Sequence, residues 1–550
     1  MNNANFNFER PENEPILSYR AGTKERKLLI AEMERMSSEV IDIPLIIGGK
    51  EIRTGNTGKV VMPHNHKHIL ATYHKAGEKE VQMAIDASMK AHKAWEGLSW
   101  IERVSITLKV ADLISKKYRH VINASTMLGQ SKNAFQAEID AADETIDFLR
   151  FNAHYISEIY HDQPISSAGI INRIEYRPLE GFVFAVSPFN FTSISANLSL
   201  APALMGNTIV WKPATTALLS NYYLMKIFKE AGLPDGVINF IPGSGALIGN
   251  KVLADKDLAG IHFTGSNNTF NHLWKTVGDN LSVYKSYPKL VGETGGKDFI
   301  FVHETAGAKE VATAMVRGAY EYQGQKCSAA SRAYLPESLW PSVKASMADM
   351  IGEIRLGDVT EFGNFMNAVI DENSFDNIMS YIDHAKKASD AEVIFGGHGD
   401  KSVGYFIEPT VILTSNPQYK SMEEEIFGPV LTIYIYKDED FEKTLDICDQ
   451  TSPYALTGSI FSNDRAAMTK ACNTLKYAAG NFYYNDKPTG AVVGQQPFGG
   501  SRASGTNDKA GSYLNLLRWT TPRTIKETLI PPTDFKYPFM SEGKCGDQKV

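Results

Sequence analysis

Short apolar segments alternate with helical segments between residues 181 and 263, and this alternation constrains the fold of the chain more than any other feature. The apolar segments 182–186, 208–211, 237–241 and 260–263 are predicted strands, and a helix is predicted from about 216 to 231. Strands that alternate with helices in this way usually lie parallel, with helices on the faces of the sheet. We therefore expect an α/β fold built on a parallel sheet.

A second α/β unit is predicted to begin near residue 290. Its apolar segments are 299–302, 333–335, 391–395 and 430–435. A chain of 550 residues with 43% hydrophobic residues is long enough for two or three packed domains.

The segments before residue 181 have a different pattern. Residues 25–160 are mainly amphipathic and helical, as in 80–90 and 103–113. Residues 162–180 contain turn formers followed by alternating apolar and polar residues, which predicts an exposed hairpin.

Charge, cysteine content and hydropathy limit the partners and the compartment. The net charge of −7 and the absence of a long Lys and Arg run argue against nucleic acid. The sequence contains no run of about 18 apolar residues, so we expect no membrane span. Four scattered cysteines indicate a reducing compartment, and we expect no metal at His64, His66 and His68. Because Glu9, Glu12 and Glu14 do not suit a transit peptide, we expect a cytoplasmic protein.

Glu293 and Cys327 are candidate catalytic residues. Glu293 lies in a glycine-rich segment, Leu-Val-Gly-Glu-Thr-Gly-Gly-Lys at 290–297, and Cys327 follows a predicted helix in Gly-Gln-Lys-Cys-Ser at 324–328. A thiolate that attacks a carbonyl and a carboxylate that draws a proton from water are sufficient for catalysis through a thioester. Taken alone, a buried cysteine is more often an ordinary core residue.

Several further motifs accompany this pair in a fixed order. They are Ser-Pro-Phe-Asn-Phe at 187–191, Trp-Lys-Pro at 211–213, Phe-Thr-Gly-Ser at 263–266, Glu-Ile-Phe-Gly-Pro at 425–429 and Pro-Phe-Gly-Gly at 497–500. Over nearly its whole length the chain resembles the aldehyde dehydrogenase superfamily. Within it, the segments 137–142, 148–153, 201–206, 494–500 and 503–508 most resemble the L-glutamate γ-semialdehyde (Δ1-pyrroline-5-carboxylate) dehydrogenase subfamily.

The resemblance implies a domain organisation. A Rossmann-like NAD-binding domain would comprise 1–160 and 180–289, an oligomerisation hairpin 161–179, and an α/β catalytic domain 290–483. Residues 484–550 would form a substrate-anchor loop, return to the NAD-binding domain and end in an oligomerisation tail. The implied partners are a second copy in a homodimer or larger homo-oligomer and, transiently, a proline dehydrogenase.

The implied reaction is oxidation of L-glutamate γ-semialdehyde to L-glutamate with NAD, the second step of proline catabolism. Cys327 would be the nucleophile, and the Asn190 amide and the Cys327 N–H would hold the oxyanion. Glu293 would activate the water that hydrolyses the thioester. Alternatives are another carboxylated semialdehyde, such as succinate semialdehyde, or a non-catalytic relative.

The resemblance also implies the cofactor site. Lys212 would bind the adenosine ribose, Ser266 the pyrophosphate, and Glu425 and Phe427 the nicotinamide ribose and ring. The remaining expected cofactor residues are Ser187, Phe189, Gly243 and Gly265. The glycines at 243, 245 and 249 miss the dinucleotide-binding spacing by one residue. Thr215 replaces a glutamate of many NAD-specific relatives, so NADP stays open, although no arginine near Thr215 would favour its phosphate.

Six residues are expected to bind the substrate. Ser328, Gly490 and Ala491 would hold its α-carboxylate, with alanine at 491 offering only a backbone N–H. Glu144 would lie near the α-ammonium, and Phe191 and Phe498 would enclose the aliphatic chain. The alternatives are a solvated helix carboxylate for Glu144 and ordinary core packing for the two phenylalanines.

Overall fold

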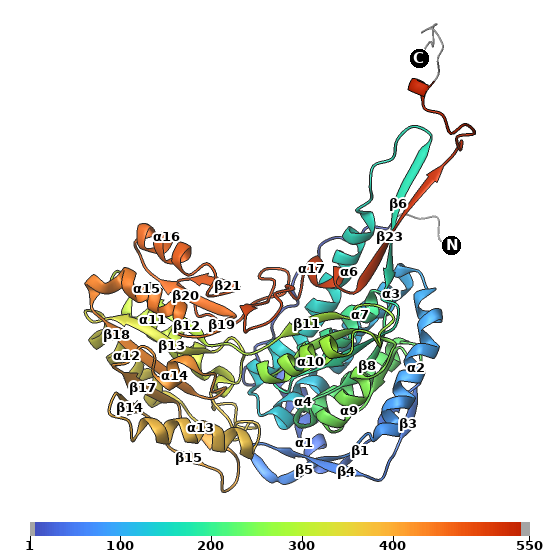
Figure 1. Ribbon diagram of the computed structural model, residues 1–550. Coiled ribbons are helices and arrows are strands. Elements are labelled where there is room, and N and C mark those ends of the chain that lie inside the picture. The colour runs from blue at the N-terminus through green and yellow to red at the C-terminus, as the bar shows by residue number, and fades with distance from the viewer. Residues whose placement is uncertain (1–5, 541–550) are drawn as a thin grey trace.

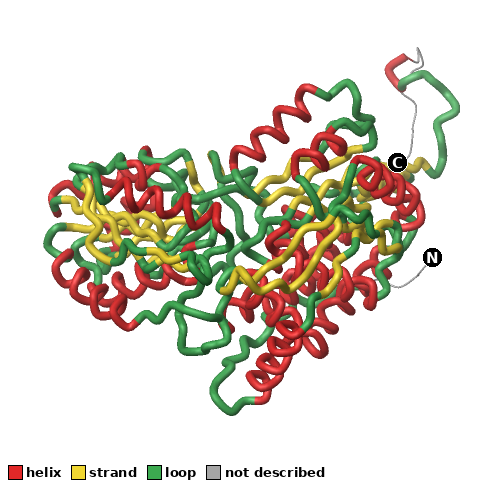
Figure 2. The backbone as a smooth tube through the Cα atoms, turned by 90° about the horizontal axis from the view of Figure 1, so that it is seen from below, coloured by secondary structure: helices red, strands yellow, loops and turns green. Residues whose placement is uncertain are grey.

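Two seven-stranded sheets organise the chain, which the computed structural model describes from residue 6 to residue 540 (Figure 1). Each sheet belongs to its own α/β unit, and the two units lie side by side. In the view of Figure 2, helices cover both faces of the sheet in the second unit. The expected α/β fold with parallel sheets is confirmed.

The first sheet has the order β11-β10-β7-β8-β9-β2-β3. Its first five strands are parallel neighbours, for example Val183 opposite Ile209 in β7 and β8. All seven residues of β10 are buried, as expected for a strand with both faces covered. The strands are β2 (Leu45–Ile47), β3 (Lys50–Ile52), β7 (Phe182–Val186), β8 (Thr208–Lys212), β9 (Ile238–Phe240), β10 (Leu258–Thr264) and β11 (Lys289–Glu293).

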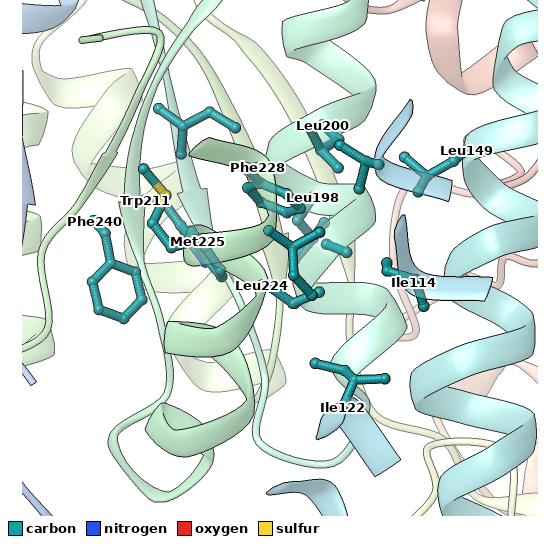
Figure 3. Close-up of a cluster of buried hydrophobic side chains, with 14 of the residues drawn as sticks. Ile114, Ile122, Leu149, Leu198, Leu200, Trp211, Leu224, Met225, Phe228 and Phe240 are labelled. Carbon is teal, nitrogen blue, oxygen red and sulfur yellow. The ribbon is translucent and has the colours of Figure 1, made fainter. Parts of the chain in front are cut away.

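The main hydrophobic core is formed by helices that precede β7 in the chain and by helices that connect the strands of this sheet. Leu224 and Phe228 of α8 pack with Trp211 of β8 and Leu198 of α7 (Figure 3). The helices are α1 (Lys24–Ser38), α2 (Glu78–Glu96), α3 (Trp100–Leu113), α4 (Arg119–Gln130), α5 (Ala134–Ala137), α6 (Thr145–His161), α7 (Thr192–Leu204), α8 (Leu218–Ala231), α9 (Gly245–Leu253) and α10 (Asn267–Asp279). The helices predicted at 80–90 and 103–113 are confirmed within α2 and α3. Two π-helical segments, 114–118 and 138–144, adjoin α4 and α6.

The second sheet has the order β14-β17-β18-β13-β12-β20-β21, with only β14 antiparallel to its neighbour. Its strands are β12 (Asp298–Val302), β13 (Ala330–Pro336), β14 (Ala391–Phe395), β17 (Thr410–Thr414), β18 (Val430–Tyr436), β20 (Thr457–Phe461) and β21 (Asn481–Tyr484). The helices that follow β11 are α11 (Ala308–Tyr320), α12 (Trp340–Glu353), α13 (Glu372–Ala385), α14 (Lys420–Glu423), α15 (Phe441–Gln450), α16 (Arg465–Thr474) and α17 (Tyr513–Leu517).

The boundary between the two sheets lies after the predicted residue 290. Strand β11 pairs with β10 through Thr264 opposite Glu293, so the first sheet continues to Glu293. The second sheet starts with β12 at Asp298. An apolar segment alone does not predict which of two sheets it joins. Here β11 pairs with β10 and so belongs to the first sheet.

A two-stranded ribbon projects from the first unit (Figure 1). The predicted hairpin at 162–180 is wrong in its pairing, because β6 (Ile170–Pro178) pairs antiparallel with β23 (Thr520–Thr528). Residues 163–166 instead form polar contacts with β6. The Ser166 hydroxyl accepts from the Asn172 N–H at 2.9 Å, and the Gln163 side chain accepts from the Ile174 N–H at 2.8 Å.

Smaller elements complete the described chain. They are the sheet of β1 (Ile41–Ile43), β4 (Thr57–Met62) and β5 (Asn65–His74), the pair β15 (Gly399–Asp400) and β16 (Phe406–Ile407), and the pair β19 (Tyr454–Ala455) and β22 (Ser501–Arg502). Between residues 6 and 540 there is no helix with both the length and the apolar character needed to cross a membrane.

Candidate active site

The carboxyl ends of the parallel strands collect several predicted site residues at one edge of the first sheet. Ser187 directly follows β7, Lys212 ends β8, Gly265 follows β10 and Glu293 ends β11. Because these neighbouring strands are parallel, their carboxyl ends lie at the same edge, where ligands bind in open α/β sheets. Three of the expected cofactor residues and the expected base therefore lie at the same edge of the first sheet.

A strained turn brings Cys327 to this edge. After α11 the chain turns through Tyr322 and Gln323, whose φ angles of 50° and 55° are left-handed. Hydrogen bonds hold the turn, since the Gln323 side chain donates to Ser131 O at 3.0 Å and Ala368 O at 2.8 Å. A β-carbon at Gly324 would lie 2.2 Å from the Gly428 carbonyl oxygen, so only glycine fits there. The predicted position of Cys327 after a helical segment is confirmed.

A cavity of about 410 Å³ joins Cys327 and Glu293. Its wall comes from both α/β units and from the segment that follows β21. Eight of the predicted site residues line it: Glu144, Phe191, Glu293, Cys327, Ser328, Gly490, Ala491 and Phe498.

Asn190 lies outside the residues that line this cavity, but it is tied to the segment carrying the thiol. Its side-chain amide donates to the backbone oxygen of Gln325 at 3.1 Å, and the residue is buried. An amide nitrogen has two N–H groups, so one remains for another acceptor.

The thiol of Cys327 is buried among carboxylates. Burial, followed by the charges of Glu293, Asp298 and Glu425, raises its pKa well above the usual thiol value. The resting thiol is therefore protonated at neutral pH. Its conversion to the thiolate requires a proton acceptor or added positive charge nearby.

Glu293 has the properties of a general base. Burial raises its pKa to about 8, while the Gly500 N–H, which donates to Oε1 at 3.2 Å, and the charge of Lys509 oppose that rise. A base whose pKa is near the working pH combines sufficient ionisation with sufficient basicity.

Beside Ser328, the cavity wall contains hydrogen-bonding groups that the sequence analysis missed. The Ser328 hydroxyl lies 2.7 Å from the hydroxyl of Thr489, next to Gly490. The Lys487 ammonium donates to the backbone oxygen of Thr489 at 2.8 Å, and Lys487 also lines the cavity. Their closeness to the expected Gly490 and Ala491 was the only sequence signal for these two residues.

Glu144 is partly buried at the end of the π-helical segment 138–144. It accepts a hydrogen bond from the Ser193 hydroxyl at 2.7 Å, and burial together with Asp140 raises its pKa to about 8. The alternative of a solvated helix carboxylate is therefore wrong. Phe191 and Phe498 are also only partly buried and line the cavity, so they are not ordinary core residues.

The groups expected to hold the cofactor fit a dinucleotide. The ammonium of Lys212 has no hydrogen-bond partner within residues 6–540, and burial lowers its pKa. Glu425 accepts the Gly296 N–H through Oε1 at 2.9 Å, which leaves Oε2 for a ribose hydroxyl. The rings of Phe189 and Phe427 meet edge to face, with centroids 5.8 Å apart.

Two helices begin beside this edge. Ser266 caps α10, and Ser244, next to Gly243, caps α9. Helix N-termini favour anionic groups such as a pyrophosphate. Gly243 has a φ of +155°, and a β-carbon there would lie 3.1 Å from the Ala76 nitrogen, so close backbone packing accounts for this glycine.

Comparison with known proteins supports this interpretation. The family model described as aldehyde dehydrogenase family matches residues 52–525. A relative from Dictyostelium discoideum, delta-1-pyrroline-5-carboxylate dehydrogenase, mitochondrial, is 56% identical over 540 residues, covering 98% of this chain and 97% of that relative.

Solved structures of related proteins have the same fold as this chain. The delta-pyrroline-5-carboxylate dehydrogenase from Mycobacterium tuberculosis bound with NAD is 48% identical, with a TM-score of 0.95 over 98% of this chain and 100% of that chain. Proline utilization A from Bdellovibrio bacteriovorus is 28% identical, with a TM-score of 0.89 over 95% of this chain but 54% of that chain.

Proposed function

This chain belongs to the aldehyde dehydrogenase family, and we propose that it oxidises L-glutamate γ-semialdehyde, which is in equilibrium with Δ1-pyrroline-5-carboxylate, to L-glutamate with NAD. The observation that carries the proposal is the single cavity that joins Cys327 and Glu293 to the loop at Gly490 and Ala491. In proline catabolism this reaction is the second step.

The proposed chemistry starts at Cys327. The Cys327 thiol first loses its proton to solvent water, and the thiolate then attacks the aldehyde carbon, so that the former carbonyl oxygen becomes the oxyanion of a thiohemiacetal. The free N–H of the Asn190 amide and the Cys327 backbone N–H stabilise that oxyanion. NAD, when bound, supplies the hydride acceptor that turns the thiohemiacetal into a thioester.

Glu293 completes the cycle. Its carboxylate takes a proton from a water molecule as that water attacks the thioester carbonyl. The carbon–sulfur bond then breaks, which releases glutamate and frees the Cys327 thiol. The hydrogen bond from Gly500 holds the carboxylate close to the cavity.

The distribution of charge in the cavity supports an amino-acid aldehyde as substrate. The cavity wall contains Lys487, whose ammonium donates to the Thr489 backbone oxygen, and it also contains Glu144, Asp143 and Asp147. Arg317 and Lys326 line it too, and both are paired with Glu321. A substrate with both an α-carboxylate and an α-ammonium can contact Lys487 through the first and Glu144 through the second, and an ammonium beside Glu144 would favour its ionised form. Succinate semialdehyde has no ammonium group for Glu144.

A panel of aldehydes tests the proposal. Purified protein is assayed for NADH formation with glutamate semialdehyde, succinate semialdehyde and propionaldehyde. We expect kcat/KM for glutamate semialdehyde to exceed that for succinate semialdehyde by about tenfold or more, the effect of roughly 1.4 kcal/mol. Reversed values would favour succinate semialdehyde, and equal values would contradict the proposed recognition of the α-ammonium.

Ala491→Leu is expected to affect the two aldehydes unequally. The larger side chain would crowd the loop and weaken one or two hydrogen bonds to the α-carboxylate, at about 1.5–3 kcal/mol each. The kcat/KM for glutamate semialdehyde should therefore fall about tenfold or more, and that for propionaldehyde much less. Equal losses for both would show that the loop does not hold the carboxylate.

Cofactor choice is part of the same proposal. We infer that NAD is preferred over NADP. The Mycobacterium tuberculosis relative is bound with NAD, and Thr215 has no arginine beside it in the sequence. Parallel assays with NAD and NADP measure the preference directly.

The proposed partners are further copies of this chain and, transiently, a proline dehydrogenase. The ribbon of β6 and β23 exposes Ile171, and Leu529 and Ile530 after it are exposed too, which suits a contact between copies. The chain covers 54% of proline utilization A, so that protein has a further part that this chain lacks. This supports a separate partner protein, the proposed proline dehydrogenase. We propose a cytoplasmic location; since the Dictyostelium relative is named mitochondrial, cell fractionation should compare the two compartments.

A further inference from the structure

An N-terminal strap, residues 8–19, forms part of the wall of the catalytic cavity. Asn13, Glu14 and Ile16 line the same cavity as Cys327 and Ala491. The strap lies outside residues 52–525, which the family model matches. This part of the wall therefore lies outside the segment that the family model matches.

Buried charges fix the strap to the helices of the first unit. The carboxylate of Glu14 accepts hydrogen bonds from Arg119 at 2.6 Å and Arg150 at 2.5 Å, and from the Ser115 hydroxyl at 2.7 Å. Further along, the Leu17 N–H donates to Glu138 at 2.8 Å. Such charge-assisted bonds between buried groups are strong, so the position of the strap is well determined.

The strap also binds the anchor loop, residues 488–496, and Asn13 is the centre of this contact. Its Nδ2 donates to Val493 O at 2.8 Å and to the Asp147 carboxylate of α6 at 2.7 Å. Its Oδ1 accepts from the Gln495 side chain at 2.8 Å. One side chain thus joins the loop to α6.

The loop depends on the strap for these bonds. Within residues 6–540, the only hydrogen bond to Val493 O comes from Asn13, and the only one to Gly494 O comes from Arg10, at 2.5 Å. Elsewhere in the loop, Ser328 and Lys487 form hydrogen bonds with Thr489, and Val493 packs against Phe148 and Phe151 of α6. Apolar packing is not directional, whereas the hydrogen bonds of Asn13 specify the position of the part of the loop that contains Val493 and Gln495.

We propose that Asn13 is a positioning residue that determines specificity, because it holds the anchor loop where Gly490 and Ala491 can receive the α-carboxylate of an amino-acid semialdehyde. Asn13 acts through Val493 and Gln495, a few residues along the chain from Ala491. The inference rests on the proposed function and adds the strap to its substrate site.

Two substitutions and one control test the proposal. Asn13→Ala removes all the bonds of the side chain, and Asn13→Asp keeps its shape but removes both N–H donors. An aspartate would also face the carboxylate of Asp147. Glu12→Ala is the matched control, because Glu12 is the preceding strap residue, is exposed and has no hydrogen bond within residues 6–540.

The kinetic result should separate binding from chemistry. We expect both Asn13 variants to raise KM for glutamate semialdehyde about tenfold, with kcat within about threefold of the parent. The kcat/KM for propionaldehyde should fall much less, and Glu12→Ala should match the parent with both aldehydes. Equal losses for the two aldehydes, or none, would overturn the role of Asn13.

Hydrogen–deuterium exchange decides the positioning step without any substrate. Amide exchange across 488–496 should be faster in both Asn13 variants and unchanged in Glu12→Ala, with the exchange of β7 and β10 as an internal measure of global stability. Unchanged loop exchange would contradict the proposal. If the parent does not oxidise glutamate semialdehyde, the proposed function fails, and loop exchange still decides whether Asn13 positions the loop.

Discussion

Cys327→Ser is expected to lower kcat/KM for glutamate semialdehyde by about 10³-fold or more while NAD binding is retained. A serine hydroxyl is far less acidic than a thiol, and the carboxylates of Glu293, Asp298 and Glu425 would oppose its ionisation further. Serine has the same branching as cysteine and a smaller side-chain atom, so it fits the same space and the strained turn before residue 327 should keep its conformation. The loss would therefore be chemical rather than structural.

The measurement is steady-state NADH formation, together with calorimetric titration of the variant with NAD. Cys472→Ser provides the control, because Cys472 lies on α16, is only partly buried and does not line the cavity. This control should keep the activity of the parent. Turnover by Cys327→Ser within about tenfold of the parent would remove Cys327 from its role as nucleophile.

Local pattern was sufficient for much of the first sheet. The strands predicted at 182–186 and 208–211 are present as β7 and β8, because buried parallel strands are short, continuously apolar and separated by helices. Glu293 and Cys327 could be paired because each has its own local signal, a glycine-rich turn and a position after a helix. Their meeting in one cavity depends on the fold.

Pairing between distant segments could not be predicted in the same way. Strand β6 has the alternation of a hairpin strand, but its partner β23 begins at Thr520, and only the tertiary structure shows that these two distant segments meet. For the same reason the start of the second unit was placed near residue 290, although β11 pairs with β10 and the first sheet continues to Glu293. A local pattern predicts that a segment forms a strand, but it does not predict which neighbouring strand it pairs with.

The strap was missed because its sequence has neither helical nor strand periodicity. Glu14 was read as an acidic residue unsuited to a transit peptide, whereas in the fold it accepts bonds from two arginines on separate helices. Thr489 was missed because a threonine beside a glycine usually indicates only a turn. Residues whose function depends on partners distant in sequence leave no local signal.

Glu293→Gln should slow thioester hydrolysis about 10²- to 10⁴-fold and leave the formation of the first NADH largely intact. A neutral amide cannot accept the proton of the attacking water, whereas hydride transfer from the thiohemiacetal does not need that carboxylate. Glutamine nearly matches glutamate in size, and its side-chain oxygen can still accept the Gly500 N–H, so the cavity should keep its shape. Thioester would then accumulate on Cys327.

Rapid mixing distinguishes the two steps. The variant should produce a burst of NADH close to one equivalent per active site, followed by a slow steady state, and mass spectrometry of the quenched protein should detect the acyl group on Cys327. Cys327→Ser is the control that should give no burst. An unchanged steady-state rate would mean that Glu293 is not the base.

The pH dependence gives a second, independent test of Glu293. Because burial raises the pKa of Glu293 to about 8, its carboxylate is mostly protonated below that pH and cannot act as a base. The hydrolysis rate of the parent should therefore rise as the pH increases through about 8, and in single-turnover experiments this rise should disappear in Glu293→Gln. Lys509 and Asp508 also act on the Glu293 carboxylate, with opposite effects on its pKa, so Lys509→Met should move the rise to higher pH by removing the stabilising positive charge. A rise that persists at the same pH in Glu293→Gln would assign the titration to another group.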